Sequence, residues 1–228
     1  MEPSADRSRV AAAWDAEYRS GRYASEPPLG FVDDIVAAAR QRGLRRGVYI
    51  GCGNGRNYVP LVEAGLDLIG LDLSATAIRQ LADRLPHRRD RLVVWDLADL
   101  PPETRYPLVV GIQVFQHGRT KEASAHIRAA RERVAPGGLL CVRVNADVTD
   151  VMHDHRVAEG SSDGSFTVQY RSGPKAGLFI HFFSRRSLED LFAIGFEPVM
   201  PMRVSVTQRV FPEVGQWSQW EAIWCRSE

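Results

Sequence analysis

The stretch Val48-Tyr49-Ile50-Gly51-Cys52-Gly53-Asn54-Gly55-Arg56-Asn57 decides the fold of this 228-residue chain. An apolar run ends at Ile50, three alternating glycines follow, and a helical pattern begins at Tyr58. Glycines after a strand allow positive φ angles and a close approach of the backbone to a ligand. The helix that follows offers unpaired N–H groups. The stretch therefore predicts a ligand-binding turn between the first strand of an α/β sheet and a helix.

The spacing of these glycines argues against two common ligand classes. The dinucleotide fingerprint G-x-G-x-x-G, counted from Gly51, would place its third glycine at Arg56, and the G-K-[ST] ending of a phosphate loop is absent. Asp72 lies 19 residues after Gly53, at the end of the second predicted strand. A carboxylate at that place can accept hydrogen bonds from both hydroxyls of a ribose. The pattern G-x-G-x-G with Asp72 therefore indicates a ligand that contains a ribose.

Strand and helix signals alternate along most of the chain. Short apolar strands separated by helices indicate parallel βαβ units that are buried on both faces. The polar segment 147–175 interrupts this alternation and predicts a single hairpin. The predicted strands cover 47–50, 67–73, 91–96, 108–113 and 139–144, the hairpin joins 166–171 to 178–183, and an antiparallel pair joins 203–210 to 220–225 after a strand that follows Gly195. The predicted helices cover 31–42, 58–64, 74–84, 121–134 and 187–194.

Composition narrows the class of protein. A chain of 228 residues with 44% hydrophobic and 25% charged residues suits one globular domain and is too apolar for intrinsic disorder. It contains no apolar run of about 18 residues, and residues 1–9 lack the apolar core of a signal peptide. The three cysteines lie far apart without a CxxC pair, so we expect no disulfide framework. We predict a cytoplasmic protein that does not bind a membrane.

The basic residues are strongly skewed toward arginine. Of 29 basic residues only Lys121 and Lys175 are lysines, and 28 acidic residues bring the net charge to +1. Without an excess of positive charge, the arginines do not predict a nucleic-acid partner. Arg143 stands out, because it lies inside a strand that should be buried. A buried guanidinium must be paired, so Arg143 either bridges to an acid or faces the ligand cleft.

Taken together, these motifs resemble those of the class I S-adenosylmethionine-dependent methyltransferases over nearly the whole chain. The resemblance implies a Rossmann-like, doubly wound, mostly parallel seven-stranded α/β sheet with a C-terminal antiparallel hairpin. It also implies S-adenosylmethionine as the methyl donor. The matching stretches are Gly51, Gly53 and Gly55 for the glycine motif, Leu71-Asp72-Leu73-Ser74 for the ribose motif, Trp95-Asp96-Leu97 with Asp99-Leu100-Pro101 for the adenine motif, Gly111 to His117 for strand four, and Ala135-Pro136-Gly137-Gly138 for the turn before strand five.

The lead-in Trp14-x-x-x-Tyr18-x-x-x-x-Tyr23 is similar to that of the tellurite-resistance and thiopurine-type methyltransferases, which act on small molecules. The resemblance implies that residues 1–30 form a lid segment and residues 31–228 a methyltransferase domain, with an insert at about 147–183. The lid aromatics would contact the sulfonium or the substrate by cation–π attraction, or the helix would simply pack onto the domain. Tyr49 departs from the family, which usually has an acid there that helps to hold the donor's amino group.

The resemblance also implies a set of site residues. His117, after strand four, and His181, on the predicted face of Phe179 and Phe183, are candidate catalytic bases, with packing as the alternative for each. His153-x-His155 resembles half of a metal site, but no third ligand has matching spacing, so we expect no metal. We expect the donor to contact Tyr18, Tyr23, Gly51, Cys52, Gly53, Asn57, Asp72, Leu73, Asp96, Leu97 and Gln113, and the substrate to contact Trp14, Arg143, Tyr170 and Arg171, with Arg143 or Arg171 as the partner if the substrate is an anion.

These residues predict transfer of a methyl group from S-adenosylmethionine to an oxygen, nitrogen or sulfur nucleophile of a small molecule. Such an in-line displacement depends mostly on positioning. Two alternatives stay open. One is an RNA or protein methyltransferase, which only the arginines favour, and the other is a non-catalytic S-adenosylmethionine-binding protein, which Tyr49 suggests. We expect a monomer or a homodimer.

Overall fold

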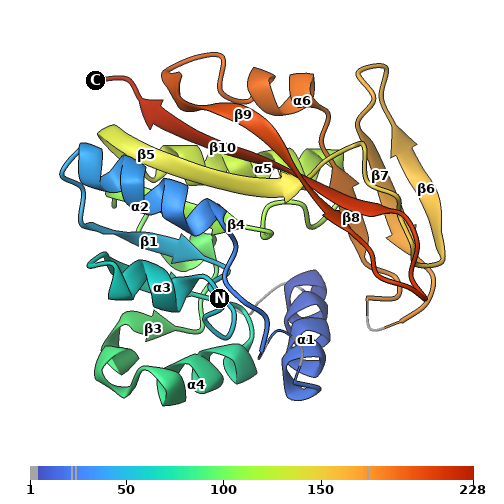
Figure 1. Cartoon of the computed structure of the whole chain (residues 1–228), viewed down its shortest axis with the longest axis horizontal. Coiled ribbons are helices and arrows are strands. Elements are labelled where there is room, and N and C mark those ends of the chain that lie inside the picture. The colour runs from blue at the N-terminus through green and yellow to red at the C-terminus, as the bar shows by residue number, and fades with distance from the viewer. Residues whose placement is uncertain (1–4, 22, 24, 174) are drawn as a thin grey trace.

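A seven-stranded sheet forms the centre of the structure, a computed structural model that describes residues 5–21, 23, 25–173 and 175–228 (Figure 1). From one edge to the other, its strands are β3 (Leu92–Val93), β2 (Asp67–Leu71), β1 (Arg46–Ile50), β4 (Tyr106–Ile112), β5 (Val134–Asn145), β10 (Gln216–Arg226) and β9 (Phe196–Gln208). The first five pair in parallel, and β10 pairs antiparallel with both β5 and β9. The predicted doubly wound, mostly parallel sheet with a C-terminal antiparallel hairpin is confirmed. Residues 1–4, 22 and 24 of the predicted lid segment and residue 174 of the insert lie outside the described part.

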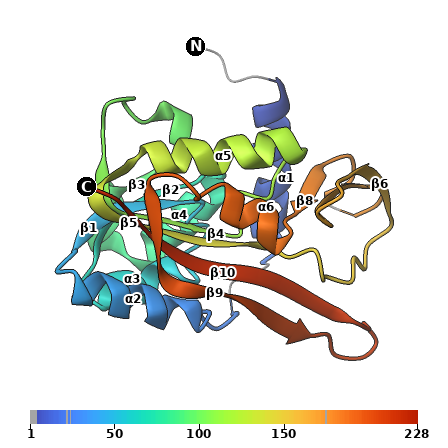
Figure 2. The same cartoon turned by 90° about the horizontal axis from the view of Figure 1, so that it is seen from above.

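Helices cover both faces of this sheet (Figure 2). They are α2 (Phe31–Gln41), α3 (Tyr58–Glu63) and α4 (Ala75–Arg84) on one face, and α5 (Thr120–Glu132) and α6 (Arg185–Asp190) on the other, with short 3₁₀ turns η1 (Pro86–Arg91) and η2 (Leu97–Asp99) in the connections. Val48 and Tyr49, neighbours on β1, enter opposite apolar clusters, as expected of a strand that is buried on both faces. No helix in the described residues is both long and apolar enough to cross a bilayer.

Two additions to the sheet lie near the carboxyl ends of its parallel strands. The helix α1 (Ala5–Arg19) lies beyond the ends of β1 and β3 (Figure 1). The insert forms a separate antiparallel sheet of β6 (His155–Gly160), β7 (Phe166–Tyr170) and β8 (Phe179–Phe182). The sequence predicted only the β7–β8 hairpin, because most of the β6 side chains are polar or exposed and Val157 is 63% exposed. The insert therefore has one strand more than its apolar pattern indicated.

Several other predicted boundaries differ from the structure. β5 begins at Val134 and takes in the predicted turn 135–138, with a register shift between Tyr106 and Leu108 of β4. β3 ends at Val93, because its partner strand β2 ends at Leu71, the residue opposite Val93. β9 is one continuous edge strand where the sequence predicted two, and its prolines are tolerated at the edge of a sheet. α6 begins at Arg185, because the Ser184 hydroxyl caps it by accepting a hydrogen bond from the backbone N–H of Ser187.

A buried ion pair joins the parallel and antiparallel parts of the sheet. Arg143 on β5 lies opposite Glu221 on β10, and its Nε donates to Glu221 Oε1 at 2.8 Å. Both residues are 3% exposed. The other oxygen of Glu221 accepts from Arg203 on β9 at 2.9 Å, and Arg203 also pairs with Asp34 on α2. The structure thus shows the first of the two arrangements expected for Arg143, a bridge to an acid.

Removing the charge of Glu221 tests how much this pair contributes to stability. Glu221→Gln leaves Arg143 buried without its full counter-charge, which should lower the free energy of unfolding by about 3–5 kcal/mol. Glu189→Gln, which breaks the solvent-exposed pair with Arg185, is the control and should cost less than about 0.5 kcal/mol. Urea denaturation measures both values, and equal costs for the two variants would contradict this account.

Candidate functional site

The glycine-rich turn and Asp72 meet at the carboxyl ends of β1 and β2. The backbone N–H of Gly53 donates to Asp72 Oδ2 and that of Ser74 donates to Oδ1, each at 2.8 Å. Gly53 has a φ of 56°, and a Cβ there would lie 2.5 Å from the hydroxyl oxygen of Tyr18. Only glycine therefore fits at this point of the turn. The turn and the carboxylate form one unit, as their spacing in the sequence predicted.

Asp72 is held in an unusual electrostatic state. The side chain is nearly inaccessible, and its burial raises the pKa of Asp72 to about 6, against the opposing effect of hydrogen bonds from Ser74 and Gly53. The nearby carboxylate of Asp15 raises the pKa further. A buried carboxylate of this kind favours a ligand that donates hydrogen bonds, because such bonds stabilise its charged form.

The helix α1 is anchored beside Asp72. Asp15 Oδ1 accepts hydrogen bonds from the Ser74 hydroxyl at 2.5 Å and from the Thr76 backbone N–H at 3.0 Å, at the start of α4. One turn later, Gln80 Nε2 donates to the backbone carbonyl of Tyr18 at 3.0 Å. These contacts fix the face of α1 that carries Trp14 and Tyr18 toward the glycine-rich turn. No pattern in the sequence predicted this contact of Asp15 with the start of α4.

Three aromatic rings of the lead-in segment form a cluster over this turn. The ring centroids lie 6.1 Å apart for Trp14 and Tyr18, 6.0 Å for Tyr18 and Tyr23, and 6.5 Å for Trp14 and Tyr23. Tyr18 is 8% exposed, whereas Trp14 and Tyr23 are half-buried. The structure thus brings together the three aromatics that the sequence selected, directly above Gly53 and Asp72.

His117 completes the aromatic cluster from the other side. It follows β4, and its ring meets the Trp14 ring edge-on at 5.4 Å. Burial of the ring and the positive charge of Lys175 lower the pKa of His117 to about 3. Gln113, at the end of β4, has a φ of 59° and donates its backbone N–H to the Arg143 carbonyl at 2.7 Å. His117 is therefore uncharged at neutral pH, and it lies beside Trp14 of α1.

His181 has a different setting. It shares a strand face with Phe183, as the alternation predicted, and the two ring centroids lie 4.4 Å apart. Its side chain is 1% exposed, and Nδ1 lies 2.9 Å from the Thr167 hydroxyl. The same hydroxyl donates to Glu159, which also accepts from the backbone N–H of Thr120 at the start of α5. These contacts join the insert to α5, so the structure supports the packing alternative for His181.

The remaining predicted residues are divided between the site and its surroundings. Asn57 Oδ1 accepts from the Leu29 backbone N–H at 3.0 Å, and Asp96 and Leu97 lie at the start of η2. Tyr170 ends β7 half-buried, with its ring 5.7 Å from that of His153, whereas the Arg171 side chain is exposed.

The described residues contain no group of three side chains that could hold a metal ion. Cys52 is buried within the turn, Gly51 opens it, and Leu73 is half-buried after Asp72.

Tyr49 belongs to the core and not to the ligand site. It is 2% exposed, and its ring packs against that of Tyr58 at 6.1 Å. The position at which the family usually has an acid is therefore an apolar contact between β1 and α3.

Lys175 is a site residue that the sequence analysis did not select. It lies half-buried in the loop between β7 and β8, and its Nζ is 4.5 Å from the centroid of the Trp14 ring. One signal was available, because Lys175 is one of only two lysines in a chain that otherwise uses arginine. The contact of Lys175 with Trp14 could not be predicted from the sequence, because it depends on how the insert folds back toward α1.

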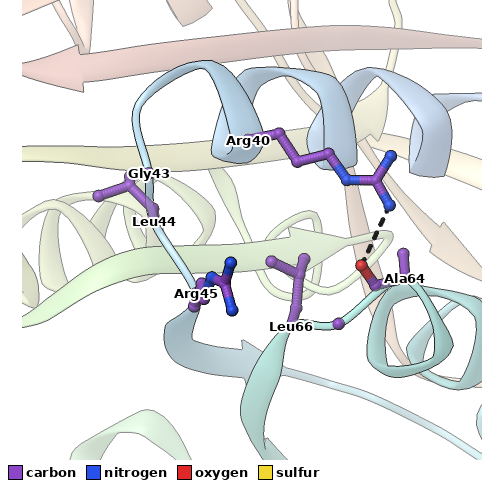
Figure 3. A pocket seen from close by; sticks show the side chains of 7 residues that line it. Arg40, Gly43, Leu44, Arg45, Ala64 and Leu66 are labelled. Atoms are coloured by element: carbon purple, nitrogen blue, oxygen red, sulfur yellow. Dashed lines mark hydrogen bonds between the residues drawn. The ribbon is translucent and has the colours of Figure 1, made fainter.

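Two surface hollows lie at the amino ends of the parallel strands, away from the glycine-rich turn. One, of about 330 Å³, is lined by residues that precede β1 and β2, among them Arg40, Arg45 and Leu66 (Figure 3). Arg40 donates to the carbonyl of Ala64 at 3.2 Å across this hollow. The second, of similar volume, lies beside it and contains Arg46 and Asp67. Neither adjoins the glycine-rich turn, which lies where the strands end.

Comparison with known proteins agrees with this geometry. The family model described as a methyltransferase domain matches residues 48–140, which run from β1 to β5 and include both the turn and Asp72. Residues 48–140 are thus similar to a methyltransferase domain. A curated relative, the ubiquinone biosynthesis O-methyltransferase of Rhodopseudomonas palustris (strain BisB18), is 26% identical over 126 residues, 50% of this chain and 48% of the relative. The chain thus spans about half the length of the curated relative that it matches.

Solved structures share the whole fold. The 1,6-didemethyltoxoflavin-N1-methyltransferase of Burkholderia thailandensis has a TM-score of 0.66 at 15% identity, covering 100% of this chain and 92% of its own. The magnesium protoporphyrin IX methyltransferase of Synechocystis PCC 6803, with bound S-adenosylmethionine, has a TM-score of 0.64 at 18% identity over the full length of both chains. TehB from Haemophilus influenzae has a TM-score of 0.61 at 16% identity, covering 94% of this chain and 67% of its own. The predicted resemblance to methyltransferases, the tellurite-resistance type included, is confirmed.

The buried state of His181 predicts a pH effect on stability. Burial lowers the pKa of His181 to about 4 from its usual 6.5, so between these values the unfolded chain binds a proton that the folded chain does not. Stability should therefore fall as the pH is lowered from 6.5 to 4, by roughly 2–3 kcal/mol from this residue. Chemical denaturation at pH 7 and pH 4 should show that His181→Gln loses less stability than wild type. His87→Gln, on the exposed turn η1, is the control, and equal losses in wild type and His181→Gln would refute the assignment.

Proposed function

We propose that this chain is an S-adenosylmethionine-dependent methyltransferase that acts on a small molecule at an oxygen, nitrogen or sulfur atom. The observation that carries the proposal is the paired hydrogen bonding of Asp72 by Gly53 and Ser74 beneath Tyr18. The turn is a cradle that a Cβ at Gly53 would fill, and the carboxylate at its base favours hydroxyl donors. These residues fit the ribose and methionine parts of the donor.

The donor supplies an activated methyl group on a sulfonium, and the chain supplies the contacts that orient it. Asp72 would accept from the ribose hydroxyls, and Asp96 with Leu97 would contact the adenine. The lid aromatics would contact the sulfonium, whose positive charge is attracted to ring faces. The full set of proposed donor residues is Tyr18, Tyr23, Gly51, Cys52, Gly53, Asn57, Asp72, Leu73, Asp96, Leu97 and Gln113. We propose residues 1–30 as the lid segment and the insert near 147–183 as the cap on the acceptor side.

Positioning, more than proton transfer, would account for the acceleration. Holding two reactants in line is worth up to about 7–11 kcal/mol, whereas an effective general base needs a pKa near the working pH. The pKa of His117, about 3, makes it a weak base. His117 would therefore help to orient the acceptor as a neutral ring beside Trp14. We assign no substrate contact to His181, whose ring packs against α5.

The arrangement of the arginines supports a small-molecule acceptor over RNA. Several arginines outside the core pair with acids, among them Arg7 with Asp99, Arg56 with Glu26, and Arg119 with Glu159. Paired guanidinium groups contribute little to the attraction of a polyanion. The matched proteins methylate different atoms, since one is named an O-methyltransferase and another an N1-methyltransferase. The acceptor atom therefore has to be found by experiment.

Calorimetry with S-adenosylmethionine and its demethylated product tests the proposal. We expect both to bind to the wild-type protein. Asp72→Ala should weaken their binding by roughly 1–3 kcal/mol, because the ribose hydroxyls lose a buried acceptor. Asp83→Ala, which removes an exposed acid of α4, is the matched control and should bind as wild type does. Absence of binding to wild type, or unchanged affinity in Asp72→Ala, would refute the proposed site.

A further inference from the structure

The loop that carries Lys175 is fixed against the lid. Within it, the backbone N–H of Gly177 donates to the Tyr170 carbonyl at 2.7 Å and that of Leu178 donates to the Lys175 carbonyl at 2.9 Å. Arg9 of α1 packs so closely on Gly177 that a Cβ there would collide with the guanidinium. With Lys175 over Trp14, the loop thus contacts α1 at two separate points. The ammonium group is therefore held in place on a short, hydrogen-bonded loop.

Lys175 lies on the side of the Trp14 ring that faces the insert. Trp14 contacts Tyr18 toward the glycine-rich turn, while Lys175 covers the Trp14 ring from the insert and His117 meets its edge. The charge of Lys175 reaches His117, since it contributes to the low pKa of that ring. The lysine thus places a positive charge where His117 and the lid converge, at the end of β4.

Aromatic side chains of the lead-in segment and of the insert lie in the same region as Lys175. The ring centroid of Tyr23 in the lead-in segment lies 6.5 Å from that of Trp14. The carbonyl of Tyr170 on β7 accepts from Gly177 in the Lys175 loop, and its ring meets that of His153 edge-on at 5.7 Å. Tyr23 and Tyr170 are half-buried, so their rings are partly open to a ligand. Rings of this kind prefer a planar, apolar partner. This region therefore combines aromatic surfaces with the fixed ammonium group of Lys175.

We propose that the methyl acceptor is a planar aromatic anion, a carboxylate or phenolate, bound with its charged oxygen toward Lys175 and its ring among Trp14, Tyr23 and Tyr170. This inference rests on the proposed function. An ammonium group held over Trp14 attracts an anionic group of a ligand that binds beside this ring. The site would thus select the acceptor by its charge as well as by its shape.

An anionic acceptor also matches the chemistry of the site. A lone pair of the acceptor oxygen forms the bond to the methyl carbon while the electron pair of the carbon–sulfur bond returns to sulfur. The products are a neutral ester or ether and a neutral thioether, and no proton is released. The step therefore needs no general base, which agrees with the weak basicity of His117. The role of binding the anion falls to Lys175, whereas the sequence favoured Arg143 or Arg171.

Matched acid and amide pairs test this inference on the protein loaded with S-adenosylhomocysteine. Benzoate with benzamide, and 2-naphthoate with 2-naphthamide, have the same shape but differ in charge. We expect each acid to bind at least about tenfold more tightly than its amide in calorimetry. Lys175→Met should remove this preference while the Kd of S-adenosylhomocysteine stays within about twofold. Lys121→Met, the other lysine, is exposed on α5 and should keep the preference.

The outcomes separate the inference from the function on which it rests. Amides that bind as tightly as acids, a preference that survives in Lys175→Met, or no binding by either member of both pairs would each overturn the acceptor class, provided that S-adenosylhomocysteine binds. If S-adenosylhomocysteine itself does not bind, the proposed function fails and this inference fails with it.

Discussion

The hydrogen bonds that tie the Gly53 and Ser74 N–H groups to Asp72 are the interaction on which the rest of the site depends. They join the ends of β1 and β2, set the path of the glycine-rich turn and place a buried carboxylate at its base. The Ser74 hydroxyl at the same point caps α4 and meets Asp15 of α1. The position of α1 is therefore set by the same few residues that hold the glycine-rich turn.

Two segments that are far apart in the sequence converge over this floor. The lid helix contributes Trp14 and Tyr18 from the N-terminal side, and the insert contributes Tyr170 and Lys175 from the C-terminal half. The two apolar clusters of the sheet include no described residue of α1 and, of residues 147–183, only Phe183. This division leaves the lid and the insert free to specify ligands on a common scaffold.

Much of the fold could be predicted because its signals are local. Apolar strands of four to six residues, the glycine spacing and the Ser74 cap each act within a few residues, and all were found at or near their predicted places. The contact between Gly53 and Asp72 was predicted for the same reason, since these residues follow neighbouring strands. The strand β6, the lid anchor Asp15 and the contact of Lys175 with Trp14 depend on long-range packing that no periodicity reports. For Arg143, the sequence predicted that the side chain is buried but did not identify its partner Glu221.

The most direct test of the central claim is a carbon-13 NMR titration of the Asp72 carboxyl group with and without S-adenosylhomocysteine. In the free protein its pKa should be raised, near 6, because the group is buried. Hydroxyl groups that donate to the carboxylate stabilise its charged form, so the ligand should lower this pKa clearly. A pKa that stays the same or rises when the ligand binds would show that Asp72 does not hold the donor and would contradict the account.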